Sequence, residues 1–294
     1  MTPAPVDVAL LLGKPVHRSP VLPDVVELLQ AAGAAVGVHV PAAPYELPPW
    51  LRRARVVGVR GLAPEALVAA QGLEAAGVRC CNPADATARV ADRAALHRVL
   101  AQAGVPVPAA QTAADWGQVR AVTAGRSVVV KAVSGHRGRG AGVMIADATN
   151  LPRTTPFPGP YLIQERVAHD GRDRKLYVIG ARVSGLLAPS PPATGPVEPF
   201  SMDAPHLDLA RRCGEATGLE LYGVDVLDGP AGPVVVDVNP FPSCRRVSGA
   251  ARSIAEYLLA CAGGQGDHAV HGLTGFRRAA SAQSPEPTQD LSGS

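Results

Sequence analysis

The chain has 294 residues, which is enough for two or three packed layers around a sizeable core. Hydrophobic residues make up 47% of it and charged residues 18%, a composition typical of soluble globular proteins. The net charge of +3 and the aromatic content of 4% argue against a protein that binds nucleic acid or a membrane.

The first predicted element is a buried strand over residues 6–13. Its apolar run is far shorter than the ~20 residues that span a bilayer, and no charged segment precedes it as in a signal peptide. The five cysteines show no CxxC or Cys/His spacing of the kind that binds zinc, which indicates reduced, buried thiols. We therefore expect a cytoplasmic protein.

Strands alternate with helices over the first 81 residues, and this alternation predicts an open, mostly parallel α/β sheet. The expected helices cover residues 24–35 and 64–76, and the further strands lie at 36–40, at 56–59 and around Val78. The first turn, Gly13 to His17, matches neither a dinucleotide-binding motif nor a P-loop.

From residue 82 onward the pattern mixes helices with strands and hairpins. The predicted elements are a helix over 85–103, strands at 127–133 and 161–165, a hairpin of 174–179 with 181–187, a helix over 205–217, a hairpin of 224–227 with 233–239 and a closing helix over 250–261. Past Gly263 the chain is rich in Gly, Ser, Pro and Gln without periodicity, which predicts a disordered tail.

Lysine is rare in this chain, since only Lys14, Lys131 and Lys175 accompany 25 arginines. A lysine retained in so arginine-rich a chain is a candidate for a specific point charge. Lys131 lies near the end of an apolar strand, where an ammonium is costly to bury without an anion. The glycines that follow it free backbone N–H groups to approach phosphate oxygens. On its own, such a loop is also typical of a flexible surface hairpin.

The hairpin after residue 223 carries the strongest chemical signal. Its turn centres near Ala231, so Asp225 is predicted to lie opposite Asp237, with Cβ atoms ~4.5–5.5 Å apart. Strand alternation puts Asn239 on the same face as Asp237. Two carboxylates this close repel unless a cation lies between them, and three oxygen ligands on one face suit Mg²⁺. A pair of solvated strand-end aspartates is the alternative.

The strand at 161–165 runs into a linker whose backbone groups could meet the edge of a purine. Lys175 starts the next strand, again beside apolar residues. Read alone, this segment is equally well an ordinary strand followed by an exposed charged turn.

Taken in order, these three segments resemble the motifs of ATP-grasp enzymes. Asp92-Arg93, with the helix that ends in Gly-Val-Pro-Val-Pro108, adds a fourth match, so the resemblance covers about residues 82–262. Within the superfamily the chain is similar to the branch shared by ribosomal-protein glutamate ligases (RimK-like) and inositol trisphosphate kinases. The run from Lys175 to Gly180 is closer to the kinases, and the glycine-dense loop after Lys131 is closer to the ligases.

The resemblance implies an α/β (α+β) ATP-grasp fold behind an N-terminal open parallel α/β sheet domain. It divides the chain into an N-terminal pre-grasp domain (1–81), a central subdomain (82–165), a C-terminal subdomain with the metal site (166–262) and the tail (263–294). It also implies ATP and Mg²⁺, with Mn²⁺ as an alternative ion. A small molecule or peptide is the expected substrate, without nucleic acid or membrane, and a homodimer is left open.

By motif position, the resemblance implies three groups of site residues. Those expected to bind ATP are Arg93, Lys131, Gly138, Gly140, Gln164, Glu165, Val167 and Lys175. Those with expected catalytic roles beside the phosphate or the acceptor are Lys175, His169 and Arg182. Those expected to bind metal are Asp225, Asp237 and Asn239.

One position departs from the family pattern. The strand after the Val-Ile-Gly turn usually ends with an arginine that steadies the transferred phosphate, and here Ala188 occupies that position. Losing one well-placed charge can cost ~10²–10³ in rate. Arg182, Arg245 and Arg246 are candidates to replace it.

The expected function is an ATP-dependent ligase that activates a carboxylate as an acyl-phosphate and joins it to an amine. A kinase for an inositol phosphate or another polyol is the second hypothesis, because scattered arginines with Lys14 and His17 could bind an anionic substrate. The third is an ATP-binding protein with little turnover. Ala188 favours this third hypothesis, and the intact metal ligands oppose it.

Overall fold

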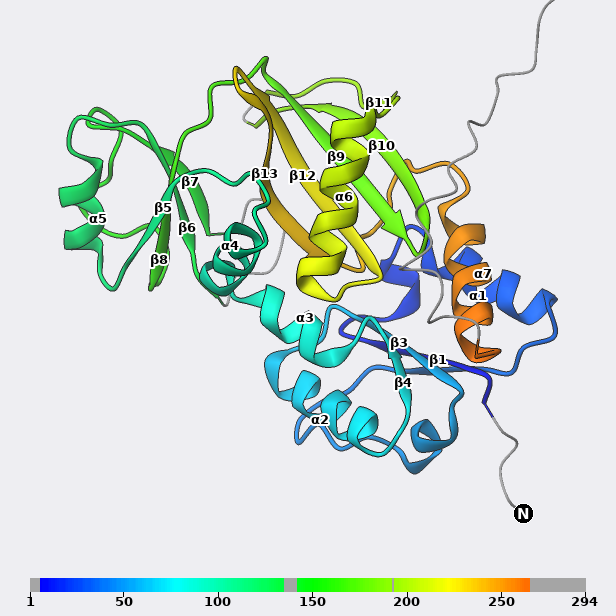
Figure 1. Cartoon of the computed structure of the whole chain (residues 1–294). Coiled ribbons are helices and arrows are strands. Elements are labelled where there is room, and N and C mark those ends of the chain that lie inside the picture. The colour runs from blue at the N-terminus through cyan, green and yellow to red at the C-terminus, as the bar shows by residue number, and fades with distance from the viewer. Residues whose placement is uncertain (1–5, 135–141, 192, 265–294) are drawn as a thin grey trace, which may run out of the picture.

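The computed structural model describes residues 6–134, 142–191 and 193–264. Almost all of the predicted tail lies outside these residues, and so do Gly138 and Gly140. Figure 1 shows three regions: a parallel sheet covered by helices on both faces, a small antiparallel sheet with one helix, and a long antiparallel sheet crossed by a helix. Across the described ranges, no helix combines the length and the apolar character needed to cross a bilayer.

The N-terminal sheet contains four parallel strands in the order β2–β1–β3–β4. Its elements are β1 (Val8–Leu12), the 3-10 helix η1 (Val16–Arg18), α1 (Leu22–Ala31), β2 (Val36–His39), the 3-10 helix η2 (Pro49–Arg53), β3 (Val56–Arg60), α2 (Pro64–Ala75) and β4 (Arg79–Cys81). The last helix of the described chain, α7 (Ala250–Ala262), also packs on this sheet. The predicted open parallel α/β sheet is therefore confirmed.

Alternation along β1 explains why helices cover both faces of the parallel sheet. Leu10 and Leu12 point into a cluster with α1 and α7, whereas Leu11 points into a cluster with α2. All three side chains are at most 1% exposed. A strand buried on both faces reads as an unbroken apolar run, as Val8–Leu12 does.

The second sheet is antiparallel, in the order β5–β8–β6–β7. Its elements are β5 (Ala110–Ala113), α5 (Trp116–Thr123), β6 (Val128–Ala132), β7 (Val143–Ala146) and β8 (Tyr161–Glu165). Trp116 packs edge-on against Tyr161, with ring centroids 5.4 Å apart, and its indole N–H donates to the Pro152 carbonyl at 3.0 Å. The sequence predicted β6 and β8 and missed β5, α5 and β7, which are short.

The third sheet is antiparallel and five-stranded, in the order β11–β10–β9–β12–β13. Its elements are β9 (Arg172–Ile179), β10 (Arg182–Pro189), β11 (Glu198–Phe200), α6 (Ala204–Thr217), β12 (Leu221–Gly229) and β13 (Gly232–Pro240). Helix α6 crosses one face of this sheet (Figure 1), over a cluster that includes Leu176, Val224 and Val238. Both predicted hairpins and the predicted helix over 205–217 are confirmed.

The helix predicted over 85–103 is in fact two helices, α3 (Ala84–Ala91) and α4 (Arg93–Gln102). Asp92 separates them because its backbone is extended and its carboxylate accepts the Ala95 N–H at 2.8 Å, which caps α4. Leu96 and Leu100 pack into the same cluster as α6 and β13. The first helices after residue 82 thus lie on the five-stranded sheet, and the domain boundaries stay a prediction.

Asn82 joins the N-terminal sheet to the five-stranded sheet. Its fully buried side chain donates to the Leu221 carbonyl at 2.7 Å and accepts from the backbone N–H groups of Glu220 and Leu221 at 2.8 and 2.7 Å. These bonds satisfy three backbone groups at the start of β12.

We expect Asn82→Ala to destabilise the chain because it leaves the backbone N–H groups of Glu220 and Leu221 without this hydrogen-bond partner, whereas the Leu221 carbonyl still accepts from the Phe241 N–H. At about 1–3 kcal/mol per unsatisfied group, the free energy of unfolding should fall by roughly 2–5 kcal/mol, measured by urea denaturation. Asn150→Ala is the matched control, since exposed Asn150 accepts one bond from the Asp147 N–H and its loss should cost under ~1 kcal/mol. Equal losses for both variants would contradict this role of Asn82.

Candidate active site

One face of the five-stranded sheet carries a row of charged side chains. Asp225 on β12 pairs directly with Asp237 on β13, as predicted, and with Lys175 on β9. The Lys175 ammonium lies 3.0 Å from the Asp225 carboxylate. The opposite face of the same strands packs under α6. Strand alternation therefore separates the charged face of the sheet from its apolar face.

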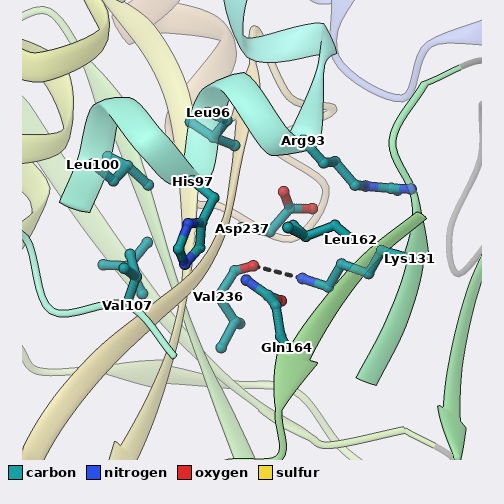
Figure 2. Close-up of a pocket in the computed structure, with 11 residues that line it drawn as sticks. Arg93, Leu96, His97, Leu100, Val107, Lys131, Leu162, Gln164, Val236 and Asp237 are labelled. Carbon is teal, nitrogen blue, oxygen red and sulfur yellow. Dashed lines mark hydrogen bonds between the residues drawn. The ribbon is translucent and has the colours of Figure 1, made fainter. Parts of the chain in front are cut away.

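A β-bulge interrupts the pairing of β12 with β13 directly after Asp225. Asp225 pairs with Asp237, but Val226 pairs with Val235, so the register skips Val236. The Val236 carbonyl accepts a hydrogen bond of 2.7 Å from the Lys131 ammonium, drawn as a dashed line in Figure 2. The bulge thus gives a strand of the small sheet a point of attachment on β13. Sequence analysis missed this bulge, because one extra residue in a Val-rich strand has no distinct signal.

Lys131 and Asp237 are the two charged groups most affected by burial in this site. The Lys131 side chain is only 7% exposed, and desolvation lowers the pKa of its ammonium while Asp237 and Asp225 act to raise it. Desolvation raises the pKa of Asp237, and the neighbouring Asp225 carboxylate raises it further, against the opposing effects of Lys131 and Arg93. Ionisation of both carboxylates therefore depends on cationic groups close by.

Arg93 reaches the site from the first turn of α4. Its guanidinium donates to the Ala132 carbonyl at 2.9 Å, and its backbone N–H donates to the Val133 carbonyl at 2.9 Å. Both acceptors lie at the end of β6, just beyond Lys131. Figure 2 shows Arg93 and Lys131 on the same side of the pocket as Asp237.

A pocket opens between α4, the small sheet and β13 (Figure 2). Its wall is mostly apolar, with a few polar groups. The lining residues are Arg93, Leu96, His97, Leu100, Val107, Lys131, Leu162, Gln164, Val235, Val236 and Asp237. An apolar cleft with charged groups at one side suits a ligand that has a flat apolar part and an anionic part. Sequence analysis predicted four of these residues and missed His97 and the aliphatic ones.

Three further residues predicted to bind ATP, Gln164, Glu165 and Val167, lie at or just beyond the end of β8. Gln164 is buried on β8 and lines the pocket, whereas Glu165 is exposed and its backbone N–H donates to the Ala109 carbonyl at 2.8 Å. Val167 is half-buried in the loop that follows. His169 lies further along this loop, where its Nδ1 accepts from the Gly171 N–H at 3.1 Å.

Asn239 and Asp173 also belong to the charged region. Asn239 is exposed on β13 opposite Gly223, two positions along the strand from Asp237. Asp173 lies two residues before Lys175 on β9, and its carboxylate is 3.7 Å from the Lys175 ammonium. Sequence analysis missed Asp173, although alternation along β9 was the signal that could have found it.

Arg182 does not join this cluster, which corrects the prediction that it replaces the missing family arginine. It is the first residue of β10, where it contacts Glu256 at 2.6 Å and Ser253 at 3.2 Å on α7. Ala188 lies six positions further along β10, about 20 Å away at ~3.3 Å per residue. Arg245 and Arg246 line a different pocket, between α1 and the start of α7.

A sequence model described as a RimK-like ATP-grasp domain matches residues 90–260. The chain belongs to the RimK-like ATP-grasp family. Proteins named probable alpha-L-glutamate ligase from Trichodesmium erythraeum and Sodalis glossinidius are 27% and 28% identical to it. These matches cover 58% and 60% of this chain and 62% and 65% of the relatives. The chain thus matches just under two thirds of their length.

Solved structures support the same fold. A RimK domain ATP-grasp protein from Sphaerobacter thermophilus superposes with a TM-score of 0.67 and 28% identity, over 85% of this chain and 98% of that one. The ATP-grasp ligase PsnB, solved with a minimal precursor, Mg and ADP, has a TM-score of 0.64 and 20% identity, over 87% of this chain and 98% of PsnB. The predicted ATP-grasp fold is confirmed, and ATP with Mg²⁺ is what this family uses.

We expect Asp237→Asn to stabilise the metal-free chain at neutral pH. Burial raises the pKa of Asp237, so ionising this group costs more in the folded chain than in the unfolded one. This penalty is absent below the ordinary aspartate pKa of about 3.9 and is fully present above the raised value. The urea midpoint of the variant should exceed that of the unmodified chain at pH 7, and the gap should close as the pH falls.

Asp208→Asn is the control for this measurement, because Asp208 is an exposed helix residue paired with Arg211. It should show no gain at pH 7. A gap for Asp237→Asn that widens as the pH falls would contradict the expected direction.

Proposed function

We propose that this chain is an ATP-dependent carboxylate–amine ligase. The observation that carries the proposal is the cluster formed where Lys131 of the small sheet meets the Asp225–Asp237 pair of the β12–β13 hairpin. Membership of the RimK-like ATP-grasp family and the names of the relatives support the same reaction. The reaction would join a carboxylate to an amine at the expense of ATP.

Asp225, Asp237 and Asn239 are the residues that would hold Mg²⁺, or Mn²⁺ in its place. The fit rests on the donor set: the carboxylates of Asp225 and Asp237 oppose each other across β12 and β13, and the Asn239 amide lies two positions along β13 from Asp237. Bound there, the ion would neutralise phosphate oxygens during transfer. Asn239 is exposed, which leaves its side of the site open to phosphates and water.

The pocket beside α4 would hold the nucleotide. Its apolar residues would cover the adenine, with Gln164 and the backbone of Glu165 and Val167 at the edge of the ring. Lys131 and Arg93 would bind the phosphates, because both present cationic groups on the side of the pocket where Asp237 lies. Gly138 and Gly140, which the resemblance assigns to ATP binding, lie outside the described residues.

The chemistry has two steps. A carboxylate oxygen of the acceptor attacks the γ-phosphorus of ATP, and the bond between that phosphorus and the bridging oxygen breaks. ADP departs, and the product is an acyl-phosphate. The amine then attacks the acyl carbon, loses a proton and displaces phosphate. Lys131 and Lys175 would stabilise the charge that develops on the transferred phosphoryl group, and positioning of the reactants supplies much of the rest. His169 would line the acceptor side.

The names of the relatives suggest the substrates. Two matched proteins are named probable alpha-L-glutamate ligase, so we infer that L-glutamate is the amine. PsnB is solved with a precursor peptide, so a peptide carboxylate is the inferred acceptor. The half-buried Lys175 lies beside Asp225, in the part of the sheet where the amine and the carboxylate would meet the phosphate.

The first test is ADP release from ATP and Mg²⁺ with carboxylate and amine pairs, including peptides with L-glutamate, and with polyols. We expect turnover that requires both a carboxylate and an amine, and that Asp237→Ala abolishes. Turnover with a polyol alone would identify a kinase instead. Mg²⁺-dependent ATP binding without any turnover would favour the non-catalytic alternative.

We expect Lys175→Met to lower kcat of the ligase reaction by ~10²–10³, because Lys175 would supply the charge that the family arginine normally provides. Arg182→Met is the matched control on the neighbouring strand, and its kcat should be unchanged, since Arg182 pairs with Glu256 away from the cluster. Steady-state ADP release measures both. A fall in kcat for Arg182→Met alone would show that Arg182, and not Lys175, supplies the missing charge.

A further inference from the structure

Three buried side chains converge where the N-terminal sheet, the five-stranded sheet and α7 meet. Cys81 ends β4, Glu220 immediately precedes β12, and Cys261 lies in the last turn of α7. The two sulfur atoms and a carboxylate oxygen of Glu220 all lie within 4.8 Å of one another. Exposed fractions are 0% for Cys81, 9% for Glu220 and 6% for Cys261.

We propose that Cys81, Glu220 and Cys261 form a binding site for a soft divalent cation, Zn²⁺, that fastens α7 to both sheets. Two thiolates and one carboxylate are ligands that Zn²⁺ takes readily, whereas Mg²⁺ prefers oxygen alone. The fourth position would go to a water, while the Tyr257 hydroxyl donates to Glu220 at 3.0 Å and holds that carboxylate in place. This site is separate from the proposed magnesium site, since Asp225 lies five residues beyond Glu220 along β12, about 16 Å at ~3.3 Å per residue.

Arg79 makes the charges of this site balance. Its guanidinium contacts one oxygen of Glu220 at 2.5 Å and donates to the Cys80 carbonyl at 2.9 Å. With both thiols deprotonated, the two thiolates, Glu220 and Arg79 carry a net charge of minus two, which one divalent cation neutralises. Metal-bound carboxylates are usually held by an outer hydrogen bond of the kind that Arg79 provides.

The backbone around the three ligands is held in place by independent contacts. Asn82, next to Cys81, binds the backbone of Glu220 through its side chain. The Glu220 carbonyl accepts from the Gly180 N–H at 2.9 Å. Gly180 has a φ of +56°, and a Cβ there would lie 2.5 Å from the Tyr257 ring, so Tyr257 packs directly on the turn between β9 and β10. The ligands therefore need little rearrangement to close on an ion.

The probe is Zn²⁺, with Co²⁺ as its spectroscopic substitute, added to the reduced, metal-free full chain in excess Mg²⁺. We expect one equivalent bound, a thiolate-to-cobalt charge-transfer absorption and about two protons released per ion. The stoichiometry and the proton count need no variant, so they test the site even where a buried substitution prevents folding.

Cys261→Ser should abolish the charge-transfer absorption and weaken Zn²⁺ binding by at least ~10-fold. Cys213→Ser is the matched control, because Cys213 is equally buried but lies on α6 outside the cluster. Failure to bind one equivalent, or binding that survives in Cys261→Ser, would overturn the proposal. So would a disulfide between Cys81 and Cys261 with no Zn²⁺ uptake after its reduction. None of these results depends on ligase turnover.

Discussion

The opposed carboxylates of Asp225 and Asp237 are the constraint on which the rest of the site depends. They face each other across β12 and β13, and burial together with mutual repulsion raises the pKa of Asp237. Such a pair remains ionised only with cationic groups close by. The chain supplies these groups from three elements: Lys175 on β9, Lys131 on β6 and Arg93 on α4. The need to offset the charge of these two carboxylates therefore favours the docking of the small sheet and of α4 onto the hairpin.

Strand alternation allows the five-stranded sheet to hold this charge and still bury an apolar face. A register shift of one residue would place Asp225 or Lys175 under α6 and bring valines into the site. The bulge after Asp225 adds one residue to β13 without reversing the faces on either side of it, since Val235 still packs with the α6 cluster. The extra residue, Val236, offers its carbonyl to Lys131. The irregular position in the hairpin is therefore the one that joins the two sheets.

Local patterns in the sequence were sufficient for the parallel sheet, both hairpins and the pairing of Asp225 with Asp237. These features depend on alternation, turn position and apolar runs, which act over a few residues. The break at Asp92 was missed because apolar residues at helical spacing occur on both sides of it, although an aspartate is a common N-cap and was the available signal. Arg182 was misplaced because sequence does not show that Glu256 on α7 would bind it. The convergence of Cys81 with Cys261 was out of reach, since it depends on how α7 packs against β4.

Ala188, the position where the resemblance to the family predicts an arginine, lies beside a consistent charge pattern in the neighbouring strand. Ala188 is buried and pairs with Asp173, whose carboxylate lies 3.7 Å from the Lys175 ammonium. Lys175 thus contacts both Asp173 and Asp225. If a metal cation bound Asp225, Lys175 would still have Asp173 as its partner. An arginine at position 188 would instead lie beside Asp173 and compete for that carboxylate. The small side chain of Ala188 therefore leaves Asp173 to Lys175, and the positive charge of Lys175 stays beside the carboxylate pair.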